Sequence, residues 1–137
     1  MGVFNLKYRD TQPVLEVALL NPDLSPADLT GSTIKLHIRL ADGATRLIRD
    51  MVIQGNPLLG IVRYQWIATD WEAASGTLVD GAYPTGGLIG PTPIVPSYGG
   101  SLEHRLEFEV INGTSRGTFP NDGYDVLRLI TDIGQGA

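Results

Sequence analysis

The stretch Ile34-Lys35-Leu36-His37-Ile38-Arg39-Leu40 alternates apolar and polar residues without a break. A period of two is typical of a β-strand that has one buried face and one face in water. Asp42-Gly43 follows at once, and a second strand-like run begins at Thr45, which predicts a β-hairpin. In the first strand we expect Ile34, Leu36 and Ile38 to point inward and Lys35 and Arg39 to point outward.

The same pattern recurs along most of the chain. It predicts further strands over residues 3–8, 14–20, 60–67, 102–111, 114–119 and 124–130, and one helical turn over 69–74. Turn sequences rich in Asn, Asp, Pro and Gly separate the runs. We therefore predict an all-β antiparallel sandwich of seven or eight strands, in a single domain that spans residues 1–137.

The alternation also predicts the core. Beyond the first hairpin, the side chains expected inside are those of Val62, Tyr64, Trp66, Leu106, Phe108 and Val110, with Arg63, Glu107 and Glu109 expected outside. Trp71 is expected at the edge of the core. Asn121-Asp122-Gly123 is typical of a tight turn, so we expect a positive φ at Gly123.

Composition excludes several functional classes. The 137 residues carry a formal net charge of −5, and the Lys and Arg residues are scattered singly, which argues against a nucleic-acid partner. The absence of cysteine excludes disulfide scaffolds, thiolate catalysis and Cys-ligated zinc. No apolar run approaches the ~18 residues of a membrane helix, so we expect no membrane partner. The N-terminus lacks the pattern of a signal peptide, so we expect synthesis in a cytoplasm, with use there or release by lysis.

No arrangement of residues predicts catalysis. His37 lies on a polar strand face and His104 opens another strand, and both are expected to be solvated or at the rim. Glu107 and Glu109 read as exposed strand glutamates, and Asn121–Asp125 reads as a turn and not as a calcium loop. We therefore expect no enzyme activity, no cofactor and no metal site.

Residues 76–101 form a segment of a different kind, with seven glycines and four prolines among many apolar residues. Long loops in compact domains are usually functional or disordered. We expect an extended arm that becomes ordered against a partner or a neighbouring copy; a floppy insertion and a loop packed on its own domain are the alternatives. The candidate partner-binding residues are Leu88, Ile89, Pro91, Pro93, Ile94, Val95, Pro96 and Tyr98.

Four blocks of the sequence resemble one family. They are PADLTGSTIKLHIR at 26–39, GIVRYQW at 60–66, LEFEV at 106–110 and TFPNDGY at 118–124. They resemble the Ig-like N-terminal domain of siphophage baseplate upper proteins, over roughly residues 10–130. The resemblance implies an Ig-like sandwich and a place in the virion after synthesis in the host cytoplasm. It implies a module that docks on the tail, baseplate or head through other virion proteins or copies of itself, and it carries over no catalytic residue.

Two alternatives stay open. The short length of the chain favours a capsid cement or decoration protein, whereas the resemblance favours the tail or baseplate. From another class, a carbohydrate-binding module would use Trp71, Tyr83 and Tyr98 as a stacking platform for a surface glycan.

Overall fold

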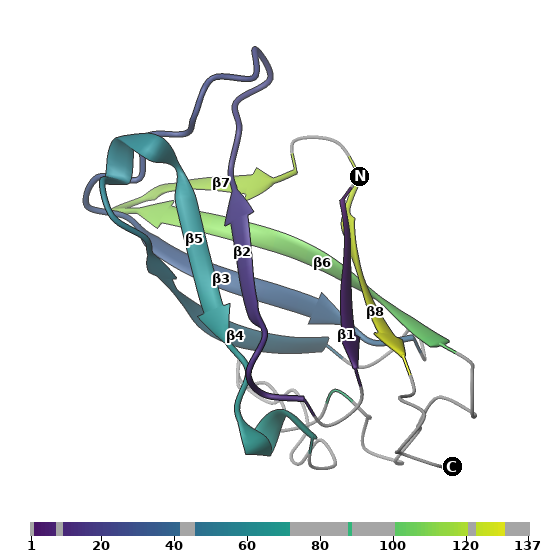
Figure 1. The fold of residues 1–137 in the computed structure, drawn as a ribbon. Helices are drawn as coiled ribbons and strands as arrows, with labels where there is room; N and C mark the ends of the chain where they lie inside the picture. The colour runs from purple at the N-terminus through teal and green to yellow at the C-terminus, as the bar shows by residue number, and fades with distance from the viewer. Residues whose placement is uncertain are drawn as a thin grey trace.

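The part of the chain that the structure describes has eight β-strands and two short 3-10 turns, which confirms the all-β prediction (Figure 1). The computed structural model describes residues 2–7, 10–41, 46–71, 88, 101–120 and 123–130. The elements are β1 Val3–Lys7, β2 Val14–Ala18, β3 Thr33–Arg39, β4 Arg46–Ile53, η1 Pro57–Leu59, β5 Ile61–Gln65, η2 Ala68–Trp71, β6 Ser101–Asn112, β7 Ser115–Phe119 and β8 Asp125–Ile130.

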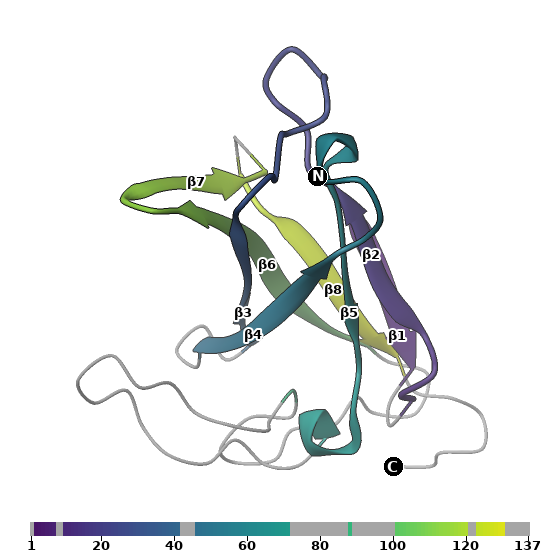
Figure 2. The same ribbon diagram turned by 90° about the vertical axis from the view of Figure 1, so that its left-hand side faces the viewer.

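The strands form one strongly curved sheet with the order β1-β8-β6-β3-β4-β5-β2, and β7 pairs with β6 beside this path. β4 joins the part of the sheet that contains β3 to the part that contains β5 and β2. Its first six residues pair with β3, and its last two, Val52 and Ile53, pair with β5. The two end strands, β1 and β2, both line one pocket, and the sheet curves so far that it nearly closes into a barrel (Figure 1, Figure 2). Within the described residues, no ladder of hydrogen bonds joins β1 to β2.

The predicted hairpin is confirmed, and the structure shows a second one. β3 and β4 pair antiparallel, with Arg39 opposite Arg46, and the connection at 42–45 lies outside the described residues. β6 and β7 pair antiparallel with Asn112 opposite Ser115. Gly113 opens the two-residue loop between them with a φ of 60°, as a type II′ turn requires.

The expectation that all strands pair antiparallel is wrong for one pair. β1 and β8 run parallel, with Val3 opposite Val126. The backbone N–H of Gly2 donates to Oδ1 of Asp125 at 2.7 Å, and the N–H of Val126 donates to the carbonyl of Gly2 at 2.8 Å. The two strands stand at opposite ends of the chain, and alternation along a strand carries no information about the direction of a partner so far away.

The predicted core residues lie inside. Buried side chains from β3, β5, β6 and the residue that follows β5 fill the barrel, whereas Tyr64 and Val110 are half-buried at its edge. The buried ones are Ile34, Leu36, Ile38, Val62, Trp66, Leu106 and Phe108. Trp71 is also buried and donates from Nε1 to the carbonyl of Asp10 at 2.9 Å. Arg39 and Glu107 are exposed as expected, and Lys35, Arg63 and Glu109 are half-buried on the outer face.

The predicted positive φ at Gly123 is confirmed, with a value of 76°. Among the described residues beyond its chain neighbours, no atom lies within 4 Å of the position where a Cβ would stand, so a side chain there meets mainly backbone strain. We expect Gly123→Val to lower the free energy of unfolding by about 1–2 kcal/mol in urea denaturation.

Gly117 is the matched control for this substitution. It lies in β7 outside the positive-φ region, with the Phe119 ring 3.6 Å from its virtual Cβ. Valine suits a strand, so Gly117→Val should leave stability nearly unchanged. Equal losses in the two variants would show that φ at Gly123 is not the cause.

Candidate functional site

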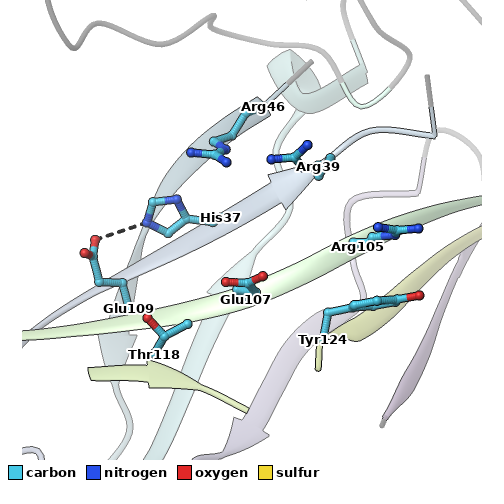
Figure 3. Close-up of a pocket in the computed structure, with 8 residues that line it drawn as sticks. All are labelled: His37, Arg39, Arg46, Arg105, Glu107, Glu109, Thr118 and Tyr124. Carbon is cyan, nitrogen blue, oxygen red and sulfur yellow. Dashed lines mark hydrogen bonds and ion pairs between the residues drawn. The ribbon is translucent and has the colours of Figure 1, made fainter. Parts of the chain in front are cut away.

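The outer face of the sheet carries a polar hollow of about 330 Å³ over β3, β4, β6 and β7 (Figure 3). The residues that line it are His37, Arg39, Arg46, Arg105, Glu107, Glu109, Thr118 and Tyr124. Five of the eight are cationic or acidic at neutral pH. The hollow is therefore suited to a charged group and not to an apolar ligand.

Strand register brings three of these arginines together. Arg39 of β3 lies opposite Arg46 of β4 on one side and opposite Arg105 of β6 on the other. In the sequence they are isolated residues, and their grouping depends on pairing between distant strands. The sequence prediction of singly scattered cations missed this cluster.

The acidic side of the hollow is partly neutralised. Nε2 of His37 lies 3.1 Å from Oε1 of Glu109, and Nη1 of Arg116 lies 3.3 Å from Oε2 of the same carboxylate. His37 therefore lies on the polar face as predicted, within an ion-pair network. The guanidinium of Arg105 lies 4.6 Å from the centroid of the Tyr124 ring, within the range of a cation–π interaction.

The described residues hold no group of three or more His, Asp or Glu side chains placed to bind a metal ion. No helix in the part of the chain that the structure describes is long and apolar enough to span a membrane.

The prediction that His104 is solvated or at the rim is wrong. Its side chain is 2% exposed, because His104 takes an inward position of β6 in the same alternation as Leu106 and Phe108. Nδ1 accepts a hydrogen bond from the N–H of Ala41 at 2.9 Å, so Nε2 carries the proton and donates to the carbonyl of Leu88 at 2.8 Å. The imidazole therefore ties the connection after β3, at Ala41, and the segment at Leu88 to the core.

His104→Ala should therefore lower the free energy of unfolding by about 2–4 kcal/mol, since it leaves the buried carbonyl of Leu88 and the part-buried N–H of Ala41 without their partner and opens a cavity. His37→Ala, on the outer face, is the matched control and should cost less than about 1 kcal/mol. Thermal or urea unfolding of both variants checks the difference. A loss in His104→Ala no larger than in His37→Ala would contradict the structural role.

A buried carboxylate organises the end of the barrel that carries η2. Asp70 of η2 is 1% exposed, and its oxygens accept from Nε of Arg49 at 2.9 Å and from the Tyr64 hydroxyl at 2.8 Å. The N–H of Ile67 adds a third hydrogen bond at 2.9 Å. Burial of the hydroxyl, followed by the charge of Asp70, raises the pKa of Tyr64 well above its usual value near 10. A helical turn was predicted over 69–74 and the structure has η2 at Ala68–Trp71, but the hydrogen-bond network of Asp70 was not predicted.

Leu88 does not fit its predicted role as a partner contact. Its side chain is fully buried, its N–H donates to the carbonyl of Asp70 at 2.7 Å, and its own carbonyl pairs with His104. Leu88 therefore belongs to the protein's own core. The other candidates, Ile89, Pro91, Pro93, Ile94, Val95, Pro96 and Tyr98, lie outside the described residues.

The predicted glycan platform loses one of its three aromatic residues. Trp71 is buried with its Nε1–H bonded to the backbone, so its ring face is not available for stacking on a sugar. Tyr83 and Tyr98 lie outside the described residues.

The end of the barrel that carries η1 exposes four leucines, which sequence reasoning did not single out: Leu20, Leu24, Leu58 and Leu59. We call them the leucine end. Leu24 stands out, because it is 75% exposed and has a φ of 70°, the one positive φ of a non-glycine residue within the described residues. An apolar groove of about 570 Å³, lined by Leu20 and Leu24 and by Phe4 and Phe119, adjoins it.

Hydrogen bonds hold the leucine end in shape. The N–H of Leu24 donates to the carbonyl of Asn21 at 2.8 Å, and the N–H of Asn21 donates to the carbonyl of Ser25 at 2.8 Å. Asp23 accepts from the hydroxyl and the N–H of Ser25, and these bonds lower the pKa of Asp23. At Gly60, after η1, a Cβ would stand 2.7 Å from the carbonyl of Leu19, so the two connections pack backbone to backbone.

Comparison with known proteins finds likenesses among solved structures only. No family model matches the chain, and no curated protein sequence matches it. Among solved structures, the N-terminal domain of phage TP901-1 ORF48 matches with a TM-score of 0.46 and 11% sequence identity, over 96% of this chain and 85% of that one. A likeness at this level does not bear on function.

Proposed function

We propose that this protein is a structural component of a bacteriophage virion, a small all-β module that docks on a tail, baseplate or head surface through protein–protein contacts. The sequence blocks that resemble the baseplate family support the virion setting. The observation that carries the docking role is Leu24, an exposed leucine held in a strained backbone conformation. The protein acts by binding and not by catalysis.

The energetics of Leu24 favour a contact that forms on assembly. A non-glycine residue in the left-handed region costs about 1–2 kcal/mol. An exposed leucine gains no burial in return while the protein is alone. Burial against a partner would contribute about 25 cal/mol per Å² of apolar surface. A contact that covers the leucine end in the assembled particle would therefore account for the strained backbone at Leu24, an exposed apolar residue.

The leucine end and the adjoining groove form a continuous surface for such a partner, since Leu20 and Leu24 belong to both. Neighbouring virion proteins and other copies of this chain are the proposed partners. The arm residues from Ile89 to Tyr98, without Leu88, stay in the proposal as a second contact. A role as a capsid cement or decoration protein differs from a tail role in copy number, which mass spectrometry of purified virions measures: hundreds of copies indicate the capsid, and a dozen or fewer the tail.

Leu24→Asn tests the docking role, because asparagine tolerates a positive φ and removes the apolar side chain. We expect the isolated variant to unfold at the same temperature as the wild type or slightly higher. We expect its incorporation into virions of the phage that encodes it to fall at least several-fold, as measured by quantitative mass spectrometry.

The matched control is Ile67→Asn, at the η2 end of the barrel, where Ile67 is 50% exposed. This variant should be incorporated like the wild type. Normal incorporation of a folded Leu24→Asn variant would contradict the docking role of the leucine end, and absence of the wild-type protein from virions would contradict the proposed function itself.

A further inference from the structure

The two end strands of the sheet leave a gap between them, which we call the seam. β1 and β2 run past each other in opposite directions and line the same two hollows (Figure 1). Nearly all Cα atoms of β1 lie more than 8 Å from those of β2, whereas directly opposite Cα atoms of paired strands lie about 4.5–5.5 Å apart. An added strand needs about 9.5 Å, since strands are spaced by 4.7–4.9 Å. The seam is therefore too wide for direct pairing, and its width suits one further strand.

The β2 wall of the seam carries backbone groups that point away from their own ladder. The N–H of Leu19 donates to the carbonyl of Gly60 at 2.8 Å, so β2 pairs with β5 through its odd-numbered residues. Consecutive residues of a strand point their N–H and C=O groups to opposite sides. The backbone groups of Glu16 and Ala18 therefore face the seam.

The β1 wall is built in the same way. The N–H of Val126 donates to the carbonyl of Gly2 at 2.8 Å, so β1 pairs with β8 through its even-numbered residues, and the backbone groups of Val3 and Asn5 face the seam. Within the described residues, the seam-facing groups of both walls have no hydrogen-bond partner. Open edges of this kind are templates for pairing with another chain.

The core is incompletely covered along the seam. Phe4 of β1 and Val17 of β2 take inward positions in their strands, yet both are only partly buried. Both line the apolar groove beside the leucine end, and Phe4 also lines a second hollow of about 350 Å³ together with the core residues Leu6 and Leu15. An added strand would cover these side chains with its own inward side chains, which recur at every second residue.

We propose that the seam binds an extended segment of a neighbouring virion protein, which enters as an additional strand between β1 and β2 and carries apolar side chains at alternate positions. The inference rests on the proposed docking role, since the groove beside the leucine end is one half of the seam, and it specifies the form of the partner. Each wall has five residues, so a segment of about five or six residues spans the seam. Main-chain hydrogen bonds to the walls supply affinity, and the alternate side chains supply specificity.

An extended segment fits the seam better than a second folded copy does. Every described strand of a copy is already paired in its own sheet, so any open edge of that copy has one free side. Such an edge could pair with one wall of the seam but not with both. A segment that lies outside a folded sheet has two free sides and can pair with both walls.

The test is amide hydrogen exchange, followed by NMR on the isolated, isotopically labelled protein, with a capped heptapeptide in which valine alternates with threonine. Without the peptide we expect fast exchange at Val3, Asn5, Glu16 and Ala18. With the peptide at millimolar concentration, exchange at these four amides should slow at least tenfold, whereas the amides between them, already in ladders, should change little. Slow exchange at the four amides in the protein alone would overturn the proposal, because the protein's own chain would then close the seam.

A second peptide separates strand pairing from simple apolar contact. The same heptapeptide with N-methylated valines keeps its side chains but loses the N–H groups along one edge. We expect it to bind at least tenfold more weakly. Equal binding of the two peptides, or no binding of the unmodified one, would overturn the proposal.

Glu16→Pro removes one seam-facing N–H and leaves the ladder with β5 intact, because an edge strand tolerates proline where its N–H points away from the sheet. This variant should bind the valine–threonine peptide at least tenfold more weakly than the wild type. Glu16→Ala, which loses the same carboxylate, is the matched control and should bind normally. Asn5→Pro and Asn5→Ala make the same comparison on β1 if Glu16→Pro does not fold. Equal binding by a folded proline variant and its alanine control would overturn the proposal.

Incorporation into virions distinguishes failure of this inference from failure of the proposed function. Glu16→Pro should be incorporated several-fold less than Glu16→Ala, as measured by quantitative mass spectrometry. Normal incorporation of Glu16→Pro would overturn the seam as the docking site and leave the virion role standing. Absence of the wild-type protein from virions would overturn the virion role and with it the identity of the partner, whereas the exchange pattern would still report strand pairing in the seam.

Discussion

Asp70→Ala should lower the free energy of unfolding by about 3–5 kcal/mol, the largest loss that we expect from a single polar substitution. The change removes the carboxylate that pairs with Arg49, whose side chain is only 14% exposed, and leaves that guanidinium buried without its anion. It also leaves the Tyr64 hydroxyl and the N–H of Ile67 without their acceptor. Urea denaturation at neutral pH, read by tryptophan fluorescence, measures the loss.

Asp50→Ala is the matched control, since it also removes an aspartate from an ion pair. Asp50 pairs with Lys35 across β3 and β4, but its side chain is 78% exposed. An exposed pair contributes at most about 1 kcal/mol, so this variant should resemble the wild type. If the two substitutions cost the same, the buried network contributes no more to stability than an exposed pair.

Phe108→Ala should cost about 3–5 kcal/mol, as expected for truncation of a fully buried aromatic side chain. Phe108 is 0% exposed at the centre of β6, the strand that pairs with β3, β7 and β8. Truncation opens a cavity that strands on both sides must tolerate. Thermal and chemical unfolding of the variant check the loss.

Phe119 provides the comparison within the same ladder. It lies directly opposite Phe108 on β7 and is only partly buried, so Phe119→Ala should cost about 1–2 kcal/mol. The order of the two losses matters more than their absolute size. A smaller loss at Phe108 than at Phe119 would contradict the assignment of β6 as the central core strand.

The alternation of inward and outward positions along a strand also indicates which polar residues are buried, although a polar residue type by itself suggests exposure. Arg49 stands between Leu47 and Met51 at inward positions of β4, and His104 stands between Leu102 and Leu106 at inward positions of β6. A charged or polar residue at such a position must be paired if it is buried. Position along the strand therefore predicts that Arg49 and His104 need partners, although it does not identify Asp70, Ala41 or Leu88.

The three arginines of the polar hollow and the leucine end, by contrast, could not be predicted from local sequence. Nothing local to Arg39, Arg46 or Arg105 indicates that they stand side by side, because their grouping is a consequence of strand register. Likewise, the exposure of Leu24 and its positive φ belong to a folded connection in which Leu24 bonds to Asn21 and Asn21 bonds to Ser25. Both surfaces, the polar hollow and the leucine end, therefore arise from tertiary structure.

By itself the sequence determined the all-β class, a count of seven or eight strands, the inward and outward faces of β3, β5 and β6, and the turn at Gly123. These features depend on side-chain period and on φ preferences, which act over a few residues. Only the tertiary structure decided that β1 runs parallel to β8, that β4 pairs with both β3 and β5, and which polar groups meet at Asp70 and in the polar hollow. The reason is physical: pairing partners and register are chosen by the packing of the whole barrel, between strands that are distant in the chain.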